Sequence, residues 1–253
     1  MVQIMTQAIR WLGRRRRDER SHMARAQFPS DFSQLEIDII RRVRPFTLTS
    51  DERICMLIRS VQYLVKHGIA VDIVECGVWR GGSMMAAALL LKHMGVSDRR
   101  LYLFDTYEGM PRPEEREQSV DGCDAQSYFR EHQTGLDSSD WCCASLDEVK
   151  RNLWSTGYDP GKIHFVRGKV EHTVPHKDLE RIALLRLDTD WYSSTKHELV
   201  HLYPLLSKGG VLIIDDYGYW SGSRKATDEY VEEHGVPLLL VRVDSSARLA
   251  VKI

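Results

Sequence analysis

The feature that most constrains this chain is a tight glycine turn between an apolar run and a helical pattern. Residues 72–76 form a β-branched run, Gly77 follows it, and Gly81-Gly82-Ser83 opens the apolar pattern of residues 84–91. Glycine lets the backbone approach another group closely, and the start of a helix presents unpaired N–H groups to an anion. A strand that feeds a helix through such a turn is typical of α/β domains that bind nucleotide-like ligands.

The spacing of this turn favours one kind of nucleotide-like ligand. It is not the Gly-x-Gly-x-x-Gly of dinucleotide-binding folds, and an acidic residue, Glu75, stands two positions before Gly77. A carboxylate suits a ligand that carries positive charge and no pyrophosphate. S-adenosylmethionine (SAM), with its ammonium and sulfonium groups, meets both conditions. We therefore expect a SAM site that includes Glu75, Gly77, Gly81 and Ser83.

Beyond this turn, strand and helix patterns alternate along the chain. Strands are predicted at residues 71–76, 100–104, 163–167, 182–187 and 210–214, with a closing pair at 237–243 and 247–252. Helices are predicted at residues 83–94, 145–156, 176–180, 192–206 and 223–234. The alternation predicts a mostly parallel sheet with helices on both faces, and the closing hairpin adds an antiparallel edge.

Two segments flank or interrupt this alternation. Before the glycine turn, a short helix is predicted at residues 31–42, and Thr49-Ser50 begins a second helix that ends at Gly68. Residues 106–144 form a long connection, rich in proline, glycine and charge, of the kind that serves as a lid or binding loop.

Composition excludes several classes of protein. The length of 253 residues suits one α/β domain with an N-terminal extension, and the formal net charge of −1 gives no electrostatic case for nucleic acid. No apolar run approaches the roughly 20 residues that cross a bilayer, so stable membrane insertion is not expected. The five cysteines lack the spacing of a disulfide framework or a zinc site, which favours reduced thiols and a cytoplasmic protein.

Carboxylates follow three of the predicted strands. Asp105 ends the second strand, where a carboxylate can accept the hydroxyls of a ribose. Asp188 and Asp190 follow the fourth strand, and Asp215 and Asp216 follow the fifth. These strand ends line one crevice, and carboxylates gathered there repel one another unless a cation neutralises them. Oxygen ligands select a hard ion, Mg²⁺ first, so a metal site is predicted.

One basic residue interrupts these acidic strand ends. Arg186 lies inside the apolar fourth strand, two positions before Asp188. A buried guanidinium needs a partner, so Arg186 is expected to pair with one of the acidic side chains or to reach the substrate.

Together these residues resemble the macrocin O-methyltransferase family, the SAM-dependent sugar methyltransferases of antibiotic pathways. The matching segments are residues 75–83, 104–111, 168–175, 187–192 and 203–218. The resemblance implies a Rossmann-like class I SAM-dependent methyltransferase fold with an N-terminal helical lid and a Mg²⁺ site. It implies Asp188, Asp215 and Asp216 as metal ligands and Asp190 as the catalytic base. It also adds Gly168 and Asp188 to the residues expected to bind the cofactor.

Two short motifs point to other chemistry. Tyr192 and Lys196 have the spacing of the catalytic pair of short-chain dehydrogenases, but the glycine spacing does not suit NAD and Leu179 stands where the usual serine would be. Asp188-Thr189-Asp190 matches the Asp-x-Asp motif of metal-dependent glycosyltransferases. A glycosyltransferase function would leave the glycine turn unexplained. A non-catalytic SAM-binding module leaves the clustered carboxylates without a use. The last two readings remain the alternatives.

The expected organisation is a basic extension at residues 1–27, a helical lid at 28–70 and a methyltransferase domain at 71–253, with 106–144 as a substrate or lid loop. The expected activity is SAM- and Mg²⁺-dependent O-methylation of a hydroxyl of a sugar or similar vicinal diol, in a secondary-metabolite or glycoside pathway. The expected partners are a small-molecule glycoside or sugar and a second copy of the chain in a homodimer.

Overall fold

The computed structural model describes residues 28–113 and 117–253, so the predicted basic extension of residues 1–27 lies outside the described residues. The chain divides into two compact units, residues 1–38 and 39–253. Helix α2 (Gln34–Val43) confirms the first predicted helix. Ser33 and Glu36 form a capping box at its start, because the Ser33 N–H donates to Glu36 at 2.6 Å and the Glu36 N–H donates to the Ser33 hydroxyl at 3.3 Å.

The second unit is built on a seven-stranded sheet with the strand order β5-β2-β1-β6-β7-β9-β8. The strands are β1 (Asp72–Cys76), β2 (Leu101–Asp105), β5 (Ile163–Arg167), β6 (Ile182–Leu187), β7 (Leu206–Ile214), β8 (Val241–Arg242) and β9 (Arg248–Val251). The first five pair in parallel, and β9 runs antiparallel to both β7 and β8. The predicted mostly parallel sheet with an antiparallel C-terminal edge is confirmed.

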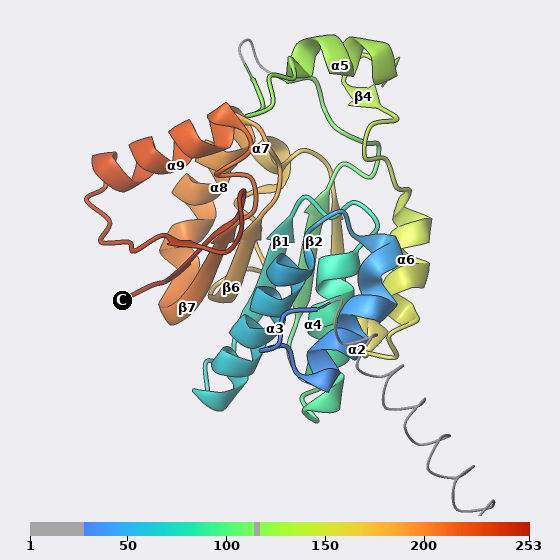
Figure 1. Ribbon diagram of the computed structural model, residues 1–253, viewed down its shortest axis with the longest axis vertical. Coiled ribbons are helices and arrows are strands. Elements are labelled where there is room, and N and C mark those ends of the chain that lie inside the picture. The colour runs from blue at the N-terminus through green and yellow to red at the C-terminus, as the bar shows by residue number, and fades with distance from the viewer. Residues whose placement is uncertain (1–27, 114–116) are drawn as a thin grey trace, which may run out of the picture. The chain divides into compact units, whose positions relative to one another are not determined.

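Helices cover both faces of this sheet (Figure 1). One face carries α3 (Asp51–Lys66), α4 (Gly82–His93) and α6 (Leu146–Trp154), and the other carries α7 (Val170–Thr173), α8 (Tyr192–Leu202) and α9 (Ser221–Glu233). Every residue of β1 and β6 is buried, as expected for strands covered on both sides. Short 3₁₀ turns, η1 (Arg44–Phe46), η2 (Pro160–Lys162) and η3 (Tyr203–Leu205), connect elements.

Helix α3 belongs to the layer that covers the sheet. The Ser50 hydroxyl accepts the Arg53 N–H and caps the helix, as predicted. The apolar stripe of α3 is buried and packs against α4, β6 and β7. The division of residues 28–70 from 71–253 as a lid and a domain stays a prediction. Among the described helices, none is long and apolar enough to cross a membrane.

Three predicted segments differ from the observed ones. Residues 176–180 form a turn, and the nearby helix is α7, which ends before Pro175 because proline forces the preceding Val174 into extended backbone. The connection 106–144 contains α5 (Ala125–His132) and a short hairpin of β3 (Gln133–Gly135) and β4 (Ser138–Ser139). The predicted strand 237–243 shortens to β8, of which both residues are exposed.

The strand order places one crevice at the centre of the sheet. Strands β2 and β5 lie on one side of β1, whereas β6 and β7 lie on the other. The winding therefore reverses between β1 and β6, and open α/β sheets bind ligands at the carboxyl ends of the strands at such a point.

Candidate functional site

A cavity of about 650 Å³ lies at the carboxyl ends of these central strands. This volume is in the range of sites for small-molecule ligands. The predicted site residues that line it are Gly77, Ser83, Asp105, Gly168, Asp188, Asp190, Asp215 and Asp216. Glu75 and Gly81 are not among the lining residues. The structure therefore brings most, but not all, of the predicted residues to one cavity.

The glycine turn is shaped by contacts within the protein as well as by the cavity. Gly77 has a φ of +81°, and a Cβ there would lie 1.9 Å from the backbone oxygen of Asp188. The Asp188 N–H donates to the Cys76 carbonyl at 2.9 Å, so the end of β1 and the residue after β6 are held together. A Cβ on Gly81 would lie 2.5 Å from the side chain of Leu153 in α6. Both glycines are required by packing against neighbouring segments.

Asp105 fixes this turn from the end of β2. Its carboxylate accepts the N–H groups of Val78 at 2.7 Å, Trp79 at 3.2 Å and Tyr107 at 2.6 Å. Burial raises the pKa of Asp105, and the three N–H donors offset part of that rise. Because Asp105 also lines the cavity, one carboxylate both holds the turn and faces the predicted ribose site.

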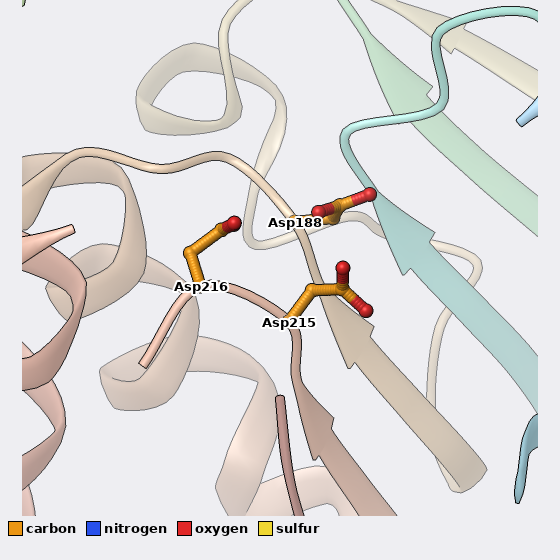
Figure 2. A group of neighbouring side chains, drawn as sticks. All are labelled: Asp188, Asp215 and Asp216. Carbon is orange, nitrogen blue, oxygen red and sulfur yellow. The ribbon is translucent and has the colours of Figure 1, made fainter. Parts of the chain in front are cut away.

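Three aspartates converge at the ends of β6 and β7. One carboxylate oxygen each from Asp188, Asp215 and Asp216 lies within 4.8 Å of the others, and Figure 2 shows the three side chains around a common space. Asp215 and Asp216 are buried, and Asp216 Oδ2 has no hydrogen-bond partner. Three carboxylates with an unpartnered buried oxygen fit a hard divalent cation such as Mg²⁺.

Arg186 organises this cluster from inside β6. Its Nη1 lies 2.6 Å from Glu75 and 2.8 Å from Asp188, and its Nη2 lies 2.9 Å from Asp215. Burial would lower the pKa of Arg186, but the three carboxylates raise it well above its usual value. The predicted pairing of Arg186 with acidic residues is confirmed, and Glu75 acts as its buried partner behind the cavity.

Arg53 approaches the cluster from α3. Its Nη1 lies 2.5 Å from Asp215, and its Nε lies 2.7 Å from Asp244 in the turn between β8 and β9. Arg53 lines the cavity, although it is 162 residues from Asp215 in the sequence. No local pattern distinguishes this arginine from the other charged residues of an amphipathic helix, so sequence reasoning missed it.

The charges in this cluster do not balance. Five carboxyl groups meet two guanidinium groups: Glu75, Asp188, Asp190, Asp215 and Asp216 against Arg53 and Arg186. Burial raises the pKa of Asp188 to about 7 although Arg186 lowers it. Burial and repulsion from neighbouring carboxylates raise the pKa of Asp190 and Asp216 well above the usual value. The cluster can therefore accept additional positive charge.

Asp190 reaches the cavity through a turn. Strand β6 ends at Leu187, and Asp190 has a φ of +67°, in the left-handed region that few non-glycine residues adopt. Asp188 and Asp190 both line the cavity, as expected from their position after the fourth predicted strand, and the left-handed turn brings Asp190 there. A histidine could serve as the base in place of Asp190, and the candidate is His172 in α7, but His172 is not among the lining residues.

An aromatic wall adjoins the aspartates. The ring centroids of Trp141, Trp191 and Trp220 lie 5.0–6.1 Å apart, and Trp141 and Trp220 line the cavity. Cys142 also lines it, and burial raises the pKa of this thiol to about 12. The long connection 106–144 thus contributes part of the wall.

The sheet order, the glycine turn after β1, the acidic residue that ends β2 and the cavity between them define a class I SAM-dependent methyltransferase. Residues 11–250 match the family Macrocin-O-methyltransferase (TylF). The chain belongs to this family and is a SAM-dependent O-methyltransferase, which confirms the resemblance found in its sequence.

Characterised relatives and a solved structure agree with this assignment. The chain is 33% identical over 198 residues to mycinamicin III 3''-O-methyltransferase of Micromonospora griseorubida, which covers 78% of this chain and 75% of the relative. It is 32% identical over 200 residues to 8-demethyl-8-(2,3-dimethoxy-alpha-L-rhamnosyl)-tetracenomycin-C 4'-O-methyltransferase of Streptomyces olivaceus, which covers 79% and 73%. The structure of the O-methyltransferase NovP superimposes with a TM-score of 0.72 at 28% identity, over 82% of each chain.

Proposed function

We propose that this protein methylates a hydroxyl group of a sugar, or of a similar vicinal diol, with SAM as methyl donor and Mg²⁺ in the aspartate cluster. The observation that carries this proposal is the convergence of Asp188, Asp215 and Asp216 on the cavity that the glycine turn and Asp105 also line. The name of the tetracenomycin relative, which includes a rhamnosyl group, supports a sugar acceptor. A secondary-metabolite pathway follows from the same relatives.

The cofactor end of the cavity is the part near β1 and β2. Gly77, Ser83, Asp105 and Gly168 line it and would contact SAM, with Asp105 accepting the ribose hydroxyls. Glu75 would not contact SAM directly and would instead hold Arg186 beside the aspartates.

The aspartate end would hold the ion and the acceptor. Carboxylate oxygens of Asp188, Asp215 and Asp216 would bind the cation. A divalent cation supplies positive charge that lowers the pKa of a nearby hydroxyl. Asp190 lines the cavity outside the three-aspartate cluster and would accept the hydroxyl proton as a general base. The residues that line the cavity would hold the acceptor oxygen in line with the methyl group of SAM. This alignment is expected to account for much of the increase in the rate of methyl transfer.

Binding measurements separate this proposal from the two alternatives. We expect SAM to bind in titration calorimetry, and UDP-sugar and NAD not to bind, with or without Mg²⁺. Binding of UDP-sugar in place of SAM would favour the glycosyltransferase reading. SAM binding without methyl transfer to any sugar acceptor would favour the non-catalytic module.

Activity measurements test the ion. Excess chelator should abolish methyl transfer to a glycoside acceptor, and Mg²⁺ should restore it. Asp215→Asn should raise the Mg²⁺ concentration required for half activity, whereas Asp121→Asn, which changes a lining carboxylate bonded to Ser119 and Tyr219, should not. Full activity in excess chelator would remove the metal from the mechanism.

We also propose that the protein works in the cytoplasm as a homodimer. All five cysteines are free, which supports a reducing compartment. At the edge of the sheet, Val241 in β8 is 51% exposed and Leu239, just before β8, is 80% exposed, and an apolar edge of this kind suits a second copy of the chain. Light scattering at several protein concentrations measures the oligomeric state directly.

A further inference from the structure

Helix α8 contains His197-Glu198-Leu199-Val200-His201, the spacing of the zinc-peptidase motif His-Glu-x-x-His. The three polar side chains do not form such a site. His197 Nε2 lies 2.8 Å from the Val174 carbonyl, whereas Glu198 is completely buried. Among the described residues, the aspartate cluster alone provides three ligand groups close enough for one ion. A fully buried glutamate on α8 therefore needs another explanation.

The contacts of Glu198 point to the loop that carries Asp188 and Asp190. The Thr189 hydroxyl lies 3.0 and 3.1 Å from its two carboxyl oxygens, and the Cys76 thiol lies beside them. Burying a carboxyl group is costly unless it is hydrogen-bonded, so this contact is the compensation for its position. Glu198 does not line the cavity, but Thr189 does.

Thr189 is held at its backbone as well as at its side chain. Its carbonyl accepts the Trp191 N–H at 2.8 Å and the Ser194 hydroxyl at 3.3 Å. Between these anchors lies Asp190, whose φ of +67° is unfavourable for a residue with a Cβ. Surrounding contacts must hold such a conformation, and they include the hydrogen bonds of Thr189 next to it as well as those of the Asp190 carboxyl group with Trp220 and Asp216.

We propose that Glu198 is a positioning residue for methyl transfer. Through the Thr189 hydroxyl it holds the turn that directs the Asp190 carboxylate into the cavity. The inference rests on the proposed role of Asp190 as the base. Glu198 does not line the cavity, so its removal should affect the rate of the chemical step and leave cofactor binding unchanged.

A double-mutant cycle tests this coupling. Glu198→Ala should lower kcat by roughly 10- to 100-fold, the scale of a misplaced catalytic group, with an unchanged Kd for SAM in calorimetry. Glu198→Gln should retain most of kcat because its amide oxygen still accepts the Thr189 hydroxyl. Thr189→Val should reproduce the loss, and the double variant should lose no more than either single one. Thr227→Val, which removes a buried hydroxyl bonded to the Ser223 carbonyl in α9, is the matched control and should keep normal kcat.

Three results would overturn the inference: normal kcat in Glu198→Ala, losses that multiply in the double variant, or the same loss in Thr227→Val. If Glu198→Ala fails to fold, Thr189→Ser and Thr189→Val decide, and equal kcat in both refutes the role of the hydroxyl contact. Asp190→Ala belongs in the same series. If Asp190→Ala is inactive and Glu198→Ala is fully active, the role of Glu198 is rejected and Asp190 remains the proposed base. If Asp190→Ala is fully active, both the proposed base and the role of Glu198 are rejected.

Discussion

Arg53 Nε lies 2.7 Å from Asp244 Oδ2, and this ion pair ties the first turn of α3 to the turn between β8 and β9. The same guanidinium lies 2.5 Å from Asp215. Asp244 is not among the lining residues of the cavity, so it holds Arg53 from behind while Arg53 faces the three clustered aspartates. Segments that are nearly 200 residues apart thereby support one another across the site.

The ion pair predicts a pH-dependent contribution to stability. Burial alone would raise the pKa of Asp244, but hydrogen bonds from Arg53, Ala247 and Ser50 outweigh it and lower the pKa to about 2. A folded-state pKa below the unfolded value means that the stabilisation is complete above about pH 4 and disappears as the pH falls toward 2. Its size is on the order of 2 kcal/mol, since one pKa unit corresponds to about 1.4 kcal/mol.

Asp244→Asn tests this contribution. The amide oxygen can still accept the N–H groups of Ser246 and Ala247, but the amide NH2 then takes the place of Oδ2. The variant therefore removes both the charge and the acceptor that face Arg53 and Ser50. Urea unfolding at pH 7 should show a loss of roughly 2 kcal/mol, and the difference from the parent protein should shrink below pH 4. A difference that stays constant from pH 7 to pH 3 would show that the charge is not responsible.

Asp105 is predicted to bind the ribose of SAM. Replacing it by Ala should weaken the binding of SAM and S-adenosylhomocysteine by on the order of 1–3 kcal/mol, because charge-assisted hydrogen bonds are left unmade. Calorimetry measures the affinity, and Asp121→Ala serves as a control elsewhere on the cavity wall. Unchanged affinity in Asp105→Ala would restrict this carboxylate to its bonds with Val78, Trp79 and Tyr107.

Gly77 and Gly122 make a matched pair for testing why the turn needs glycine. Both have a positive φ, but a Cβ on Gly77 would overlap the Asp188 carbonyl, whereas a Cβ on Gly122 would meet open space. Gly122→Ala should cost about 1–2 kcal/mol from left-handed backbone alone. Gly77→Ala should cost a further 1–3 kcal/mol or more from overpacking. Equal losses in urea unfolding would mean that the close approach to Asp188 carries no energetic weight.

The strands and the aspartates at their ends could be predicted because the signals are local. An apolar run followed by acidic residues marks the ends of β6 and β7 in the sequence itself, and parallel strands bring such ends together. Glu75 shows where local reasoning fails. A carboxylate inside an apolar run suits a cofactor ligand equally well, and only the register that pairs Glu75 with Arg186 reveals its partner.

The remaining features depend on tertiary packing. Arg53 meets Asp215 because α3 lies against the sheet, and nothing in the sequence of an amphipathic helix fixes that contact. The prediction of a helix at residues 176–180 was wrong, because these residues form a turn and the nearby helix α7 lies before Pro175, which ends it. Trp220 joins the aromatic wall from the start of α9, far in sequence from the connection that supplies Trp141.

The aspartates of the Asp188-Thr189-Asp190 segment should have separable roles. Asp188 belongs to the three-carboxylate cluster and bonds to Arg186, whereas Asp190 lies outside that trio on the left-handed turn. Asp188→Ala should therefore weaken Mg²⁺ and acceptor binding together. Asp190→Ala should keep SAM and Mg²⁺ binding and lose turnover by roughly 10²–10⁴-fold, the range for general acid–base catalysis.

Calorimetry with SAM and Mg²⁺, followed by single-turnover methyl transfer, distinguishes these variants. Asp121→Ala again controls for the loss of a lining carboxylate outside the cluster. Turnover and Mg²⁺ affinity are measured for each variant. Asp190→Ala should lower turnover alone, whereas Asp188→Ala should lower both turnover and Mg²⁺ affinity. Normal turnover with an unchanged pH profile in Asp190→Ala would place the base elsewhere. Val170 and Glu171 of α7 line the cavity but His172 does not, so that result would also require the His172 side chain to turn toward the cavity before it could replace Asp190.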